Sequence, residues 1–334
     1  MTPDWQQLEL SPELIHVLLE AGLNKPTRIQ HQVIPLAMEG HDIMATSPTG
    51  TGKTLAFLLP VFQYLSDFPR RAPGNARALV LVPTRELAEQ IGRVAEQLAV
   101  ATDLTCLTIT GGVNFGSHLG ALEKNVDLII ATPGRLIDYL AAEQFSAEDI
   151  ELLILDEGDR LLDMGFRGAV EQIQTEAPSL KQRMLFSATA DHNALKAFSK
   201  QALSQPVVVE AEPPKRERGK INQWVHIIDD TEHKLQVLEH LLKSVTGRVL
   251  VFVRKRDKVH ELEPIMSSKG FPTVSLEGQL PQAERQKRLK TFHDLRARIM
   301  IATDVAARGI DIPDVELVIN YDMPRRGDSY VHRI

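Results

Sequence analysis

The sequence predicts an α/β fold with two domains, each a mostly parallel sheet with helices on both faces. Short apolar runs alternate with helical stretches along the 334 residues, which is typical of parallel strands buried on both sides. Residues 211–220 contain two prolines, a glycine and dense charge, which break helices and strands and predict a linker. We therefore expect a first domain at residues 1–210 and a second at residues 221–334.

Each expected element follows from its own stretch of sequence. Runs rich in Val, Ile and Leu predict the strands of the first domain, which are Asp42–Thr46, Ala78–Val82, Leu104–Ile109, Asp127–Ala131, Leu152–Leu155, Arg183–Phe186 and Val207–Glu210. The same criterion predicts the strands of the second domain, which are Arg248–Val253, Thr273–Leu276, Arg298–Ala302 and Leu317–Asn320. Helices are expected between them, among them Arg85–Ala99, Arg167–Glu176 and Lys234–Lys243.

The composition excludes several classes of protein. Hydrophobic residues make up 43% of the chain and charged residues 25%, as in globular proteins. No apolar run approaches the roughly 18 residues of a membrane helix, and the first residues do not resemble a secretory signal. The single cysteine, Cys106, forms no internal disulfide, and no Cys/His cluster predicts zinc. We expect a cytoplasmic protein without a membrane segment or zinc.

Charge is distributed unevenly along the chain. The net charge is −6, but residues 1–210 hold 16 Lys and Arg against 26 Asp and Glu, a balance of −10. Residues 211–334 hold 22 against 18, a balance of +4. A surface for nucleic acid must therefore be local. A solvated surface with no such partner explains the asymmetry equally well.

A phosphate-binding loop follows the first strand. In an open parallel sheet, ligands bind beyond the carboxyl ends of the strands. The residues there are Ser47, Pro48, Thr49, Gly50, Thr51, Gly52, Lys53 and Thr54, whose glycines let backbone N–H groups point at phosphate oxygens. We expect Lys53 to reach the β- and γ-phosphates and Thr54 to hold magnesium. The usual pattern has glycine where Ser47 stands, so a structural turn without nucleotide is the alternative.

An acidic pair follows the fifth strand, as a magnesium–nucleotide site requires. Asp156 suits the metal, and Glu157 suits the attacking water, either as general base or as the group that positions it. Acidic residues that only solvate a loop are the alternative.

Polar groups after the second, third and fourth strands suit the backbone of a single nucleic-acid strand. Arginines there can pair with phosphates, while threonine hydroxyls and glycine amides can donate hydrogen bonds. The candidates are Pro83, Thr84, Arg85, Gly111, Gly112, Thr132, Pro133 and Arg135. Aromatic residues are 5% of the chain, which favours contacts to the backbone over base stacking. For each arginine alone, a surface ion pair is the alternative.

These motifs, in this order, resemble those of the DEAD-box RNA helicases, which contain two tandem RecA-like domains. Gly22–Gln30 resembles the family's Q motif, Asp156–Asp159 its name-giving tetrad, and Ser187–Thr189 the motif that links hydrolysis to unwinding. Gly158 stands where the family has alanine, and we expect a small effect, a looser turn. In the second domain, Val251–Arg254, Gly278 with Gln282 and Arg285, and Ala302–Asp311 also match.

The resemblance implies roles for further residues and two cofactors, ATP and Mg²⁺. Gln30 would read adenine, with Arg28 in the same motif and Trp5 nearby, and Asp311 would approach the ribose. Ser187 and Thr189 would join the catalytic group, and Asp159 and Arg308 would connect the domains. The residues implied to contact RNA in the second domain are Arg254, Gly278 and Thr303.

Finer features bear on the partners and on activity. Arg216–Trp224 and Asp229–Lys234 resemble the bacterial SrmB-type helicases, which implies pre-ribosomal particles as partners. The last residues, His332–Ile334, resemble the start of the family's last motif, whose two later arginines are absent from the sequence. Such arginines contribute on the order of 10³–10⁵ in rate. We therefore expect a second domain incomplete at its C-terminus and slow or absent turnover from these residues.

Two functions remain open at this point. One is an ATP-dependent RNA helicase that unwinds short duplexes or remodels RNA–protein complexes. The other is an ATP-gated RNA clamp or assembly scaffold with negligible turnover. An unrelated nucleotide switch with the same phosphate loop is less consistent with the motifs of the second domain.

Overall fold

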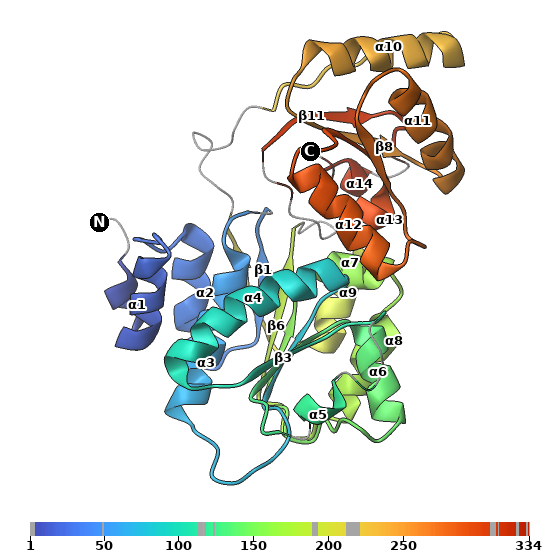
Figure 1. Ribbon diagram of the computed structural model, residues 1–334. Helices are drawn as coiled ribbons and strands as arrows, with labels where there is room; N and C mark the ends of the chain where they lie inside the picture. The colour runs from blue at the N-terminus through green and yellow to red at the C-terminus, as the bar shows by residue number, and fades with distance from the viewer. Residues whose placement is uncertain are drawn as a thin grey trace. The chain divides into compact units, whose positions relative to one another are not determined.

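The computed structural model describes residues 4–48, 50–112, 116, 118–122, 124–188, 193–211, 221–307, 312, 314–324, 327–331 and 333 (Figure 1). The chain divides into two compact units, Met1–Arg218 and Gly219–Ile334. Residues 212–220, which form most of the expected linker, lie outside the described part of the chain.

The first unit contains a seven-stranded sheet whose neighbouring strands run parallel. Its strands are β1 (Ile43–Thr46), β2 (Ala78–Leu81), β3 (Cys106–Ile109), β4 (Leu128–Ala131), β5 (Leu152–Leu155), β6 (Gln182–Ser187) and β7 (Val207–Glu210). They lie in the order β3-β4-β2-β5-β6-β1-β7. All seven strands that the sequence predicts for the first domain are present.

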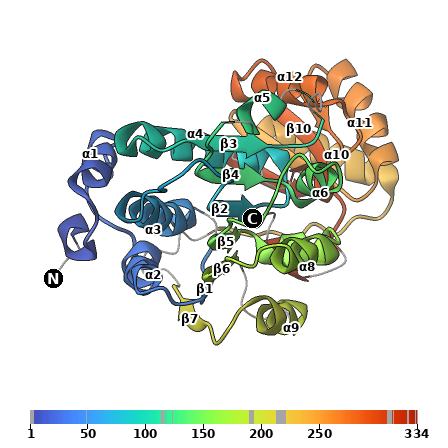
Figure 2. The same cartoon turned by 90° about the horizontal axis from the view of Figure 1, so that it is seen from below.

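Helices cover both faces of this sheet because each central strand is apolar on both sides. In β2, Ala78 and Val80 contribute to one buried cluster, while Leu79 and Leu81 contribute to the other. The first cluster includes α1 (Pro12–Glu20), α2 (Arg28–Met38), α3 (Lys53–Asp67) and α4 (Arg85–Thr102). The second includes α6 (Pro133–Ala141), α7 (Gly158–Asp163), α8 (Arg167–Thr175) and α9 (Asn193–Ala202). Figure 2 shows the strands between these two layers.

The second unit repeats this plan on a smaller scale. Its parallel sheet has the order β11-β8-β10-β9, with β8 at Arg248–Val253, β9 at Thr273–Leu276, β10 at Ile299–Thr303 and β11 at Val315–Asn320. One face packs against α10 (Thr231–Ser244) and α11 (Arg256–Ser268). The other packs against α12 (Gln282–His293) and α13 (Asp304–Ala307). The predicted fold class, two α/β units with parallel sheets covered on both faces, is confirmed.

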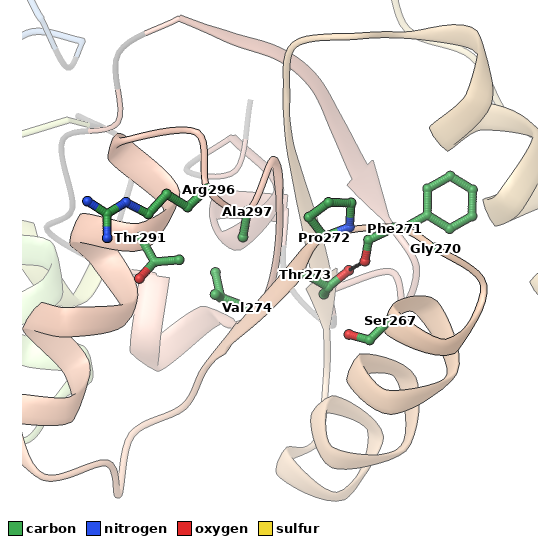
Figure 3. Close-up of a pocket in the computed structure, with 9 residues that line it drawn as sticks. All are labelled: Ser267, Gly270, Phe271, Pro272, Thr273, Val274, Thr291, Arg296 and Ala297. Atoms are coloured by element: carbon green, nitrogen blue, oxygen red, sulfur yellow. Dashed lines mark hydrogen bonds between the residues drawn. The ribbon is translucent and has the colours of Figure 1, made fainter.

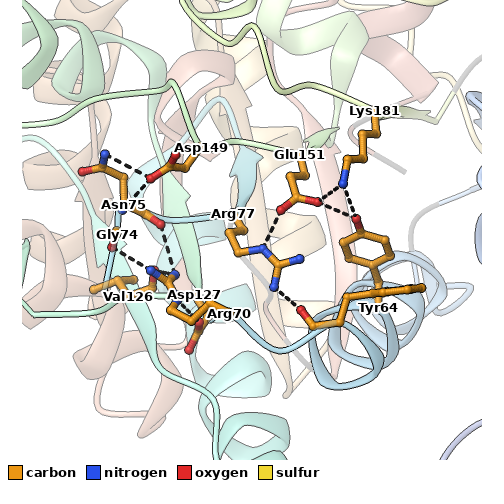
Figure 4. A network of polar contacts seen from close by, with 11 residues as sticks. Tyr64, Arg70, Gly74, Asn75, Arg77, Val126, Asp127, Asp149, Glu151 and Lys181 are labelled. Carbon is orange, nitrogen blue, oxygen red and sulfur yellow. Dashed lines mark hydrogen bonds and ion pairs between the residues drawn. The ribbon is translucent and has the colours of Figure 1, made fainter. Parts of the chain in front are cut away.

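A polar network fastens the amino-terminal edge of the first sheet, opposite to the edge where ligands are expected (Figure 4). Glu151, just before β5, accepts hydrogen bonds from Arg77 at 2.6 Å, Lys181 at 2.6 Å and the Tyr64 hydroxyl at 2.5 Å. Burial alone would raise the pKa of Glu151, but these three donors lower it to about 2. The carboxylate is therefore ionised at neutral pH and ties α3 to the start of the sheet.

Candidate functional site at the carboxyl edge of the sheets

The candidate residues of the first unit fall into two adjacent groups at the carboxyl edge of its sheet. The strands β5, β6 and β1 are neighbours, and Asp156, Ser187 and Ser47 stand at their carboxyl ends. The strands β3, β4 and β2 are also neighbours, and they lead into Gly111, Thr132 and Thr84. We call these the nucleotide half and the RNA half of the edge, after the ligands that the sequence predicts for them. The sequence alone predicts the strands but not this separation, because it depends on the strand order.

The loop between β1 and α3 is held by its own polar groups. The Lys53 ammonium donates to the Ser47 carbonyl at 2.7 Å, and the Ser47 and Thr51 hydroxyls lie 2.6 Å apart. The Thr51 hydroxyl also donates to the Pro48 carbonyl at 2.8 Å. Gly50 and Gly52 have φ values of +75° and +93°, which side chains disfavour. Thr54 lies in the first turn of α3, and Thr49 lies outside the described residues.

Gln30 connects the Q-motif segment to this loop. Its side-chain oxygen accepts from the backbone N–H of Thr27 at 2.7 Å, which closes a capping box at the start of α2. Its side-chain nitrogen donates to the carbonyl of Gly52 at 3.0 Å. The carboxamide of Gln30 therefore connects the start of α2 to the loop.

Trp5 and Arg28 lie in different environments. Trp5 is buried, and its indole N–H donates to the Leu23 carbonyl at 2.7 Å, so it supports the Q-motif segment from within the core. Arg28 is exposed at the first position of α2. Leu23, Gly52 and Thr54 also border an apolar pocket of about 240 Å³ among α1, α3 and α4.

Asp156 is a fully buried carboxyl group directly after β5. Its pKa is raised to about 6, mainly by burial and also by Glu157 and Asp159, while Lys53 and the Glu157 amide oppose the shift. A buried carboxyl with this pKa beside a phosphate loop is suited to a bound cation, which would stabilise its charged form. Asp156 and the Thr54 hydroxyl thus fit Mg²⁺, which usually takes few protein ligands and keeps water or phosphate as the others.

Glu157 adopts a left-handed backbone conformation with φ of 51° and ψ of 49°. This conformation is uncommon for a residue with a side chain and occurs often at functional sites. Its two carboxylate oxygens accept from one guanidinium nitrogen of Arg160, at 3.0 and 2.8 Å. Arg160 was not among the predicted site residues, although its position three residues further on in a helix signals the contact.

Gly158 has a packing role in the structure, and the expected looser turn stays a prediction. Its backbone is not in the left-handed region, and it begins α7. A Cβ atom at this position would collide with a methyl group of Leu185 on β6 and would lie 3.4 Å from Leu195 on α9. The glycine therefore allows α7 to approach β6 closely.

The other predicted residues of this half lie close by. Ser187 is buried at the end of β6, and its carbonyl accepts from the Ser47 amide at 3.1 Å, which connects β6 to the phosphate loop. Asp159 is also buried. Thr189 lies outside the described residues.

In the RNA half, Arg85 lies across the glycine pair. A Cβ atom on Gly112 would overlap the Arg85 guanidinium, and one on Gly111 would lie 3.1 Å from it. The Thr84 hydroxyl caps α4 by accepting a hydrogen bond from the Leu87 amide at 3.3 Å. Pro83, directly before it, is buried. The sequence motif alone does not predict that the glycines make room for the arginine.

The strand ends of the RNA half are joined through Thr132. Its amide donates to the carbonyl of Ile109 at 3.2 Å, and Pro133 begins α6 directly after it. The Arg135 guanidinium lies 5.5 Å above the ring of Tyr139 and 3.6 Å from Asp138. Arg135 is thus oriented by a buried aromatic ring that the sequence did not single out.

The candidates of the second unit also lie at the carboxyl ends of strands. Thr303 ends β10 and pairs with Val253, so Arg254 is the next residue on the neighbouring strand. Gly278 follows β9 by two residues. A pocket of about 430 Å³ at the amino end of β9 lies at the opposite edge of this sheet and takes no part in the site (Figure 3). Arg308 and Asp311 lie outside the described residues.

Comparison with known proteins decides the family. A model of the DEAD/DEAH box helicase matches residues 27–198, and a model of the helicase conserved C-terminal domain matches residues 233–334. This chain belongs to the DEAD/DEAH box helicase family. Two similar relatives are named ATP-dependent RNA helicase SrmB. The one from Escherichia coli is 48% identical over 99% of this chain and 74% of its own length. The one from Haemophilus influenzae is 46% identical over 99% of this chain and 75% of its own length.

Other members of the family extend the likeness in sequence and in structure. The ATP-dependent RNA helicase DRS1 of Saccharomyces cerevisiae is 37% identical, over the whole chain and 45% of its own length. A structure of S. cerevisiae Dbp5 bound to RNA and ADP BeF3 has a TM-score of 0.83 at 27% identity, over 99% of this chain and 85% of that one. A structure of Mss116p bound to ssRNA and AMP-PNP has a TM-score of 0.84 at 26% identity, over 99% and 70%.

None of the described helices combines the length and the apolar character that crossing a bilayer would require.

Proposed function

We propose that this chain is the core of an ATP-dependent RNA helicase that grips the backbone of one RNA strand and uses ATP hydrolysis to separate short duplexes or remodel RNA–protein complexes. The division of the sheet edge into a nucleotide half and an RNA half carries this proposal, because both ligands would contact consecutive strands of one rigid sheet. The names of the SrmB and DRS1 relatives support it.

In the nucleotide half, the proposal gives each residue one task. Lys53 moves from the Ser47 carbonyl to the β- and γ-phosphates, the loop amides bind phosphate oxygens, and Gln30 binds the adenine edge. Thr54 and Asp156 would hold Mg²⁺, which when bound neutralises charge on the phosphates. Glu157 orients the water that attacks the γ-phosphorus, so that the bond to ADP breaks as the bond to water forms.

The contact between Glu157 and Arg160 supports a role for Glu157 in orienting the water. The Arg160 guanidinium donates to both oxygens of the carboxylate and so fixes its direction. A carboxylate in this contact keeps lone pairs free for a water molecule. We therefore propose that Glu157 positions the water.

In the RNA half, positive and hydrogen-bonding groups face the phosphate backbone. Arg85 and Arg135 would pair with phosphates, and Thr84, Thr132 and the glycine amides would donate hydrogen bonds. Arg254, Gly278 and Thr303 would do the same in the second unit. Contacts to the phosphate backbone do not distinguish one base from another, so the proposed RNA binding is independent of base sequence.

The biological setting is proposed from the relatives. The similarity to the SrmB helicases leads us to propose RNA of pre-ribosomal particles as a substrate. A bacterial ribosome-assembly factor works in the cytoplasm, which is the location this proposal implies.

The test is ATP hydrolysis with and without single-stranded poly(U), together with poly(U) binding at saturating ATP. In a chain extended to include the two later arginines of the last motif, we expect RNA to stimulate hydrolysis, and we expect Glu157→Gln to abolish hydrolysis while ATP-dependent RNA binding remains. Glu171→Gln is the matched control, because Glu171 forms an exposed ion pair with Arg167 in the same unit. RNA binding that depends on ATP without hydrolysis would favour the clamp, and indifference to RNA would contradict both functions.

A further inference from the structure

A buried arginine lies at the carboxyl edge of the sheet in the second unit. The Arg333 side chain is 1% exposed, and its Nε and one terminal nitrogen donate to the two carboxylate oxygens of Asp304, at 2.5 and 2.7 Å. Asp304 directly follows Thr303, the last residue of β10. The bidentate ion pair therefore holds the end of the strand that presents Thr303.

The remaining contacts of Arg333 reach two other strands. Its second terminal nitrogen donates to the Asn320 side chain at 2.6 Å and to the Asp322 carbonyl at 2.8 Å, at and just beyond the end of β11. Its guanidinium lies 4.8 Å from the ring centre of Phe252 on β8. A guanidinium stays charged in proteins, and burying it is costly unless its donors are paired. Arg333 thus joins the carboxyl ends of β8, β10 and β11.

Asp322 carries this network on to Arg254. Its amide donates to the Phe252 carbonyl at 3.1 Å, which continues the pairing of β11 with β8. Its carboxylate accepts from the backbone N–H of Arg254 and from the Lys234 ammonium, each at 3.0 Å. The Arg254 guanidinium in turn donates to the carbonyl of Met323 at 3.2 Å. The backbone and the side chain of Arg254 are therefore both anchored to the segment that Arg333 holds.

We propose that Arg333 and Asp322 are positioning residues that fix Thr303 and Arg254 in the arrangement that binds RNA phosphates. The proposal rests on the proposed function, because it presumes that these two residues contact RNA. Neither Arg333 nor Asp322 needs to touch RNA, since Arg333 is buried and Asp322 is an acid that phosphate would repel. Their effect reaches RNA only through the residues that they hold.

An arginine at the opposite edge of the same sheet, Arg298, provides a control. It distinguishes a loss of RNA binding caused by displaced residues from one caused by lower stability of the unit. Arg298, just before β10, donates to the carbonyls of Val245 at 3.2 Å and Leu242 at 2.5 Å, and its guanidinium lies 5.8 Å from the centre of the Phe271 ring. It supports the amino ends of the strands in the way that Arg333 supports the carboxyl ends. Its loss should lower the stability of the unit without disturbing Thr303 or Arg254.

The test compares Arg333→Met, Arg333→Lys, Asp322→Ala and Arg298→Met in the full chain. The first readout is the affinity for a fluorescent oligo(U) strand at saturating MgATP, and the second is hydrogen exchange at the amides of Arg254 and Thr303 without ligands. Thermal melting reports stability. We expect Arg333→Met and Asp322→Ala to weaken RNA binding roughly tenfold and to accelerate exchange at Arg254. Arg333→Lys should retain part of the RNA affinity and part of the protection of the Arg254 amide, because lysine keeps the charge but not the planar set of donors.

Two results would overturn the proposal. The first is that Arg333→Met leaves RNA affinity and exchange at both amides unchanged. The second is that Arg298→Met, at an equal loss of melting temperature, weakens RNA binding as much as Arg333→Met does. If the unsubstituted chain binds no oligo(U), the proposed function fails on its own. Exchange at Arg254 and Thr303 then still decides whether Arg333 holds them.

Discussion

The side-chain amide of Gln30 donates a hydrogen bond to the carbonyl oxygen of Gly52 over 3.0 Å, although the two residues are 22 positions apart. A Cβ atom on Gly52 would lie only 2.5 Å from that nitrogen, so the contact depends on glycine at this position. One carboxamide thus connects the segment proposed to read adenine with the loop proposed to bind phosphate. We therefore expect Gln30 to couple the state of the phosphate loop to the recognition of the base.

We predict that Gln30→Ala weakens ATP binding about tenfold and reduces the preference for ATP over GTP, because one or two hydrogen bonds are lost. Gln30→Glu should weaken it further, since a carboxylate oxygen would face the Gly52 carbonyl. Titration with fluorescent ATP and GTP measures both effects. Gln63→Ala is the control, because Gln63 is a buried glutamine that accepts the Ser11 amide away from the loop. Unchanged selectivity in Gln30→Ala would contradict the coupling.

The buried Asp156 predicts a dependence of stability on pH. Its pKa in the folded chain, about 6, lies above the ordinary value of 3.8, so the folded state binds the proton more tightly. The stability that protonation provides is complete below pH 3.8 and is lost as the pH rises through 6. The full effect is about 3 kcal/mol in the absence of magnesium and nucleotide.

Asp156→Asn removes this titration while keeping an oxygen that can accept the Glu157 amide. We therefore predict that the variant gains stability relative to the unsubstituted chain, and that the gain is larger at pH 8 than at pH 5. Urea unfolding at both pH values, without Mg²⁺ or nucleotide, measures the difference. An equal difference at the two pH values would show that Asp156 does not titrate in this range.

The Leu185 side chain occupies the space that a side chain at position 158 would need. We predict that Gly158→Ala lowers the free energy of unfolding by about 1–3 kcal/mol, because Leu185 or α7 must move. Leu185→Ala in the same chain should remove most of the additional cost, so the two substitutions should be non-additive. The control is Gly168→Ala in α8, where a Cβ meets open space. Additive losses in the double variant would mean that the two positions are independent.

Gly112 makes room for Arg85. We predict that Gly112→Ala weakens oligo(U) binding about as much as Arg85→Met, roughly tenfold, and that the double variant is no weaker than either one. Gly112 has a φ of +78°, so alanine also strains the backbone. Gly40→Ala provides the control, because Gly40 has a φ of +81° but nothing within 4 Å of a Cβ. If Gly112→Ala bound RNA with full affinity, the position of Arg85 would not depend on the glycine.

The strands and the nucleotide motif could be predicted from the sequence because their signals are local. An apolar run such as Leu152–Leu155 followed by Asp156 contains the strand, its end and its carboxylate in consecutive residues. The close approach of α7 to Leu185 at Gly158 could not be predicted, because it joins two elements that are distant in sequence. Neither could the strand order that separates the two halves, nor the convergence of Asp304, Asn320 and Asp322 on Arg333. These features arise from packing between elements, which the pattern of one chain does not encode locally.

The central claim is that the carboxyl edge of the first sheet binds nucleotide on β5, β6 and β1 and RNA on β3, β4 and β2. Hydrogen exchange measured first with MgATP alone and then with oligo(U) added at saturating MgATP tests it most directly. We predict that MgATP slows exchange in residues 47–54 and 156–158, and that the added oligo(U) slows exchange in residues 84–85, 111–112 and 132–135. Protection of the second set by MgATP alone, or of neither set when its own ligand is added, would contradict the claim.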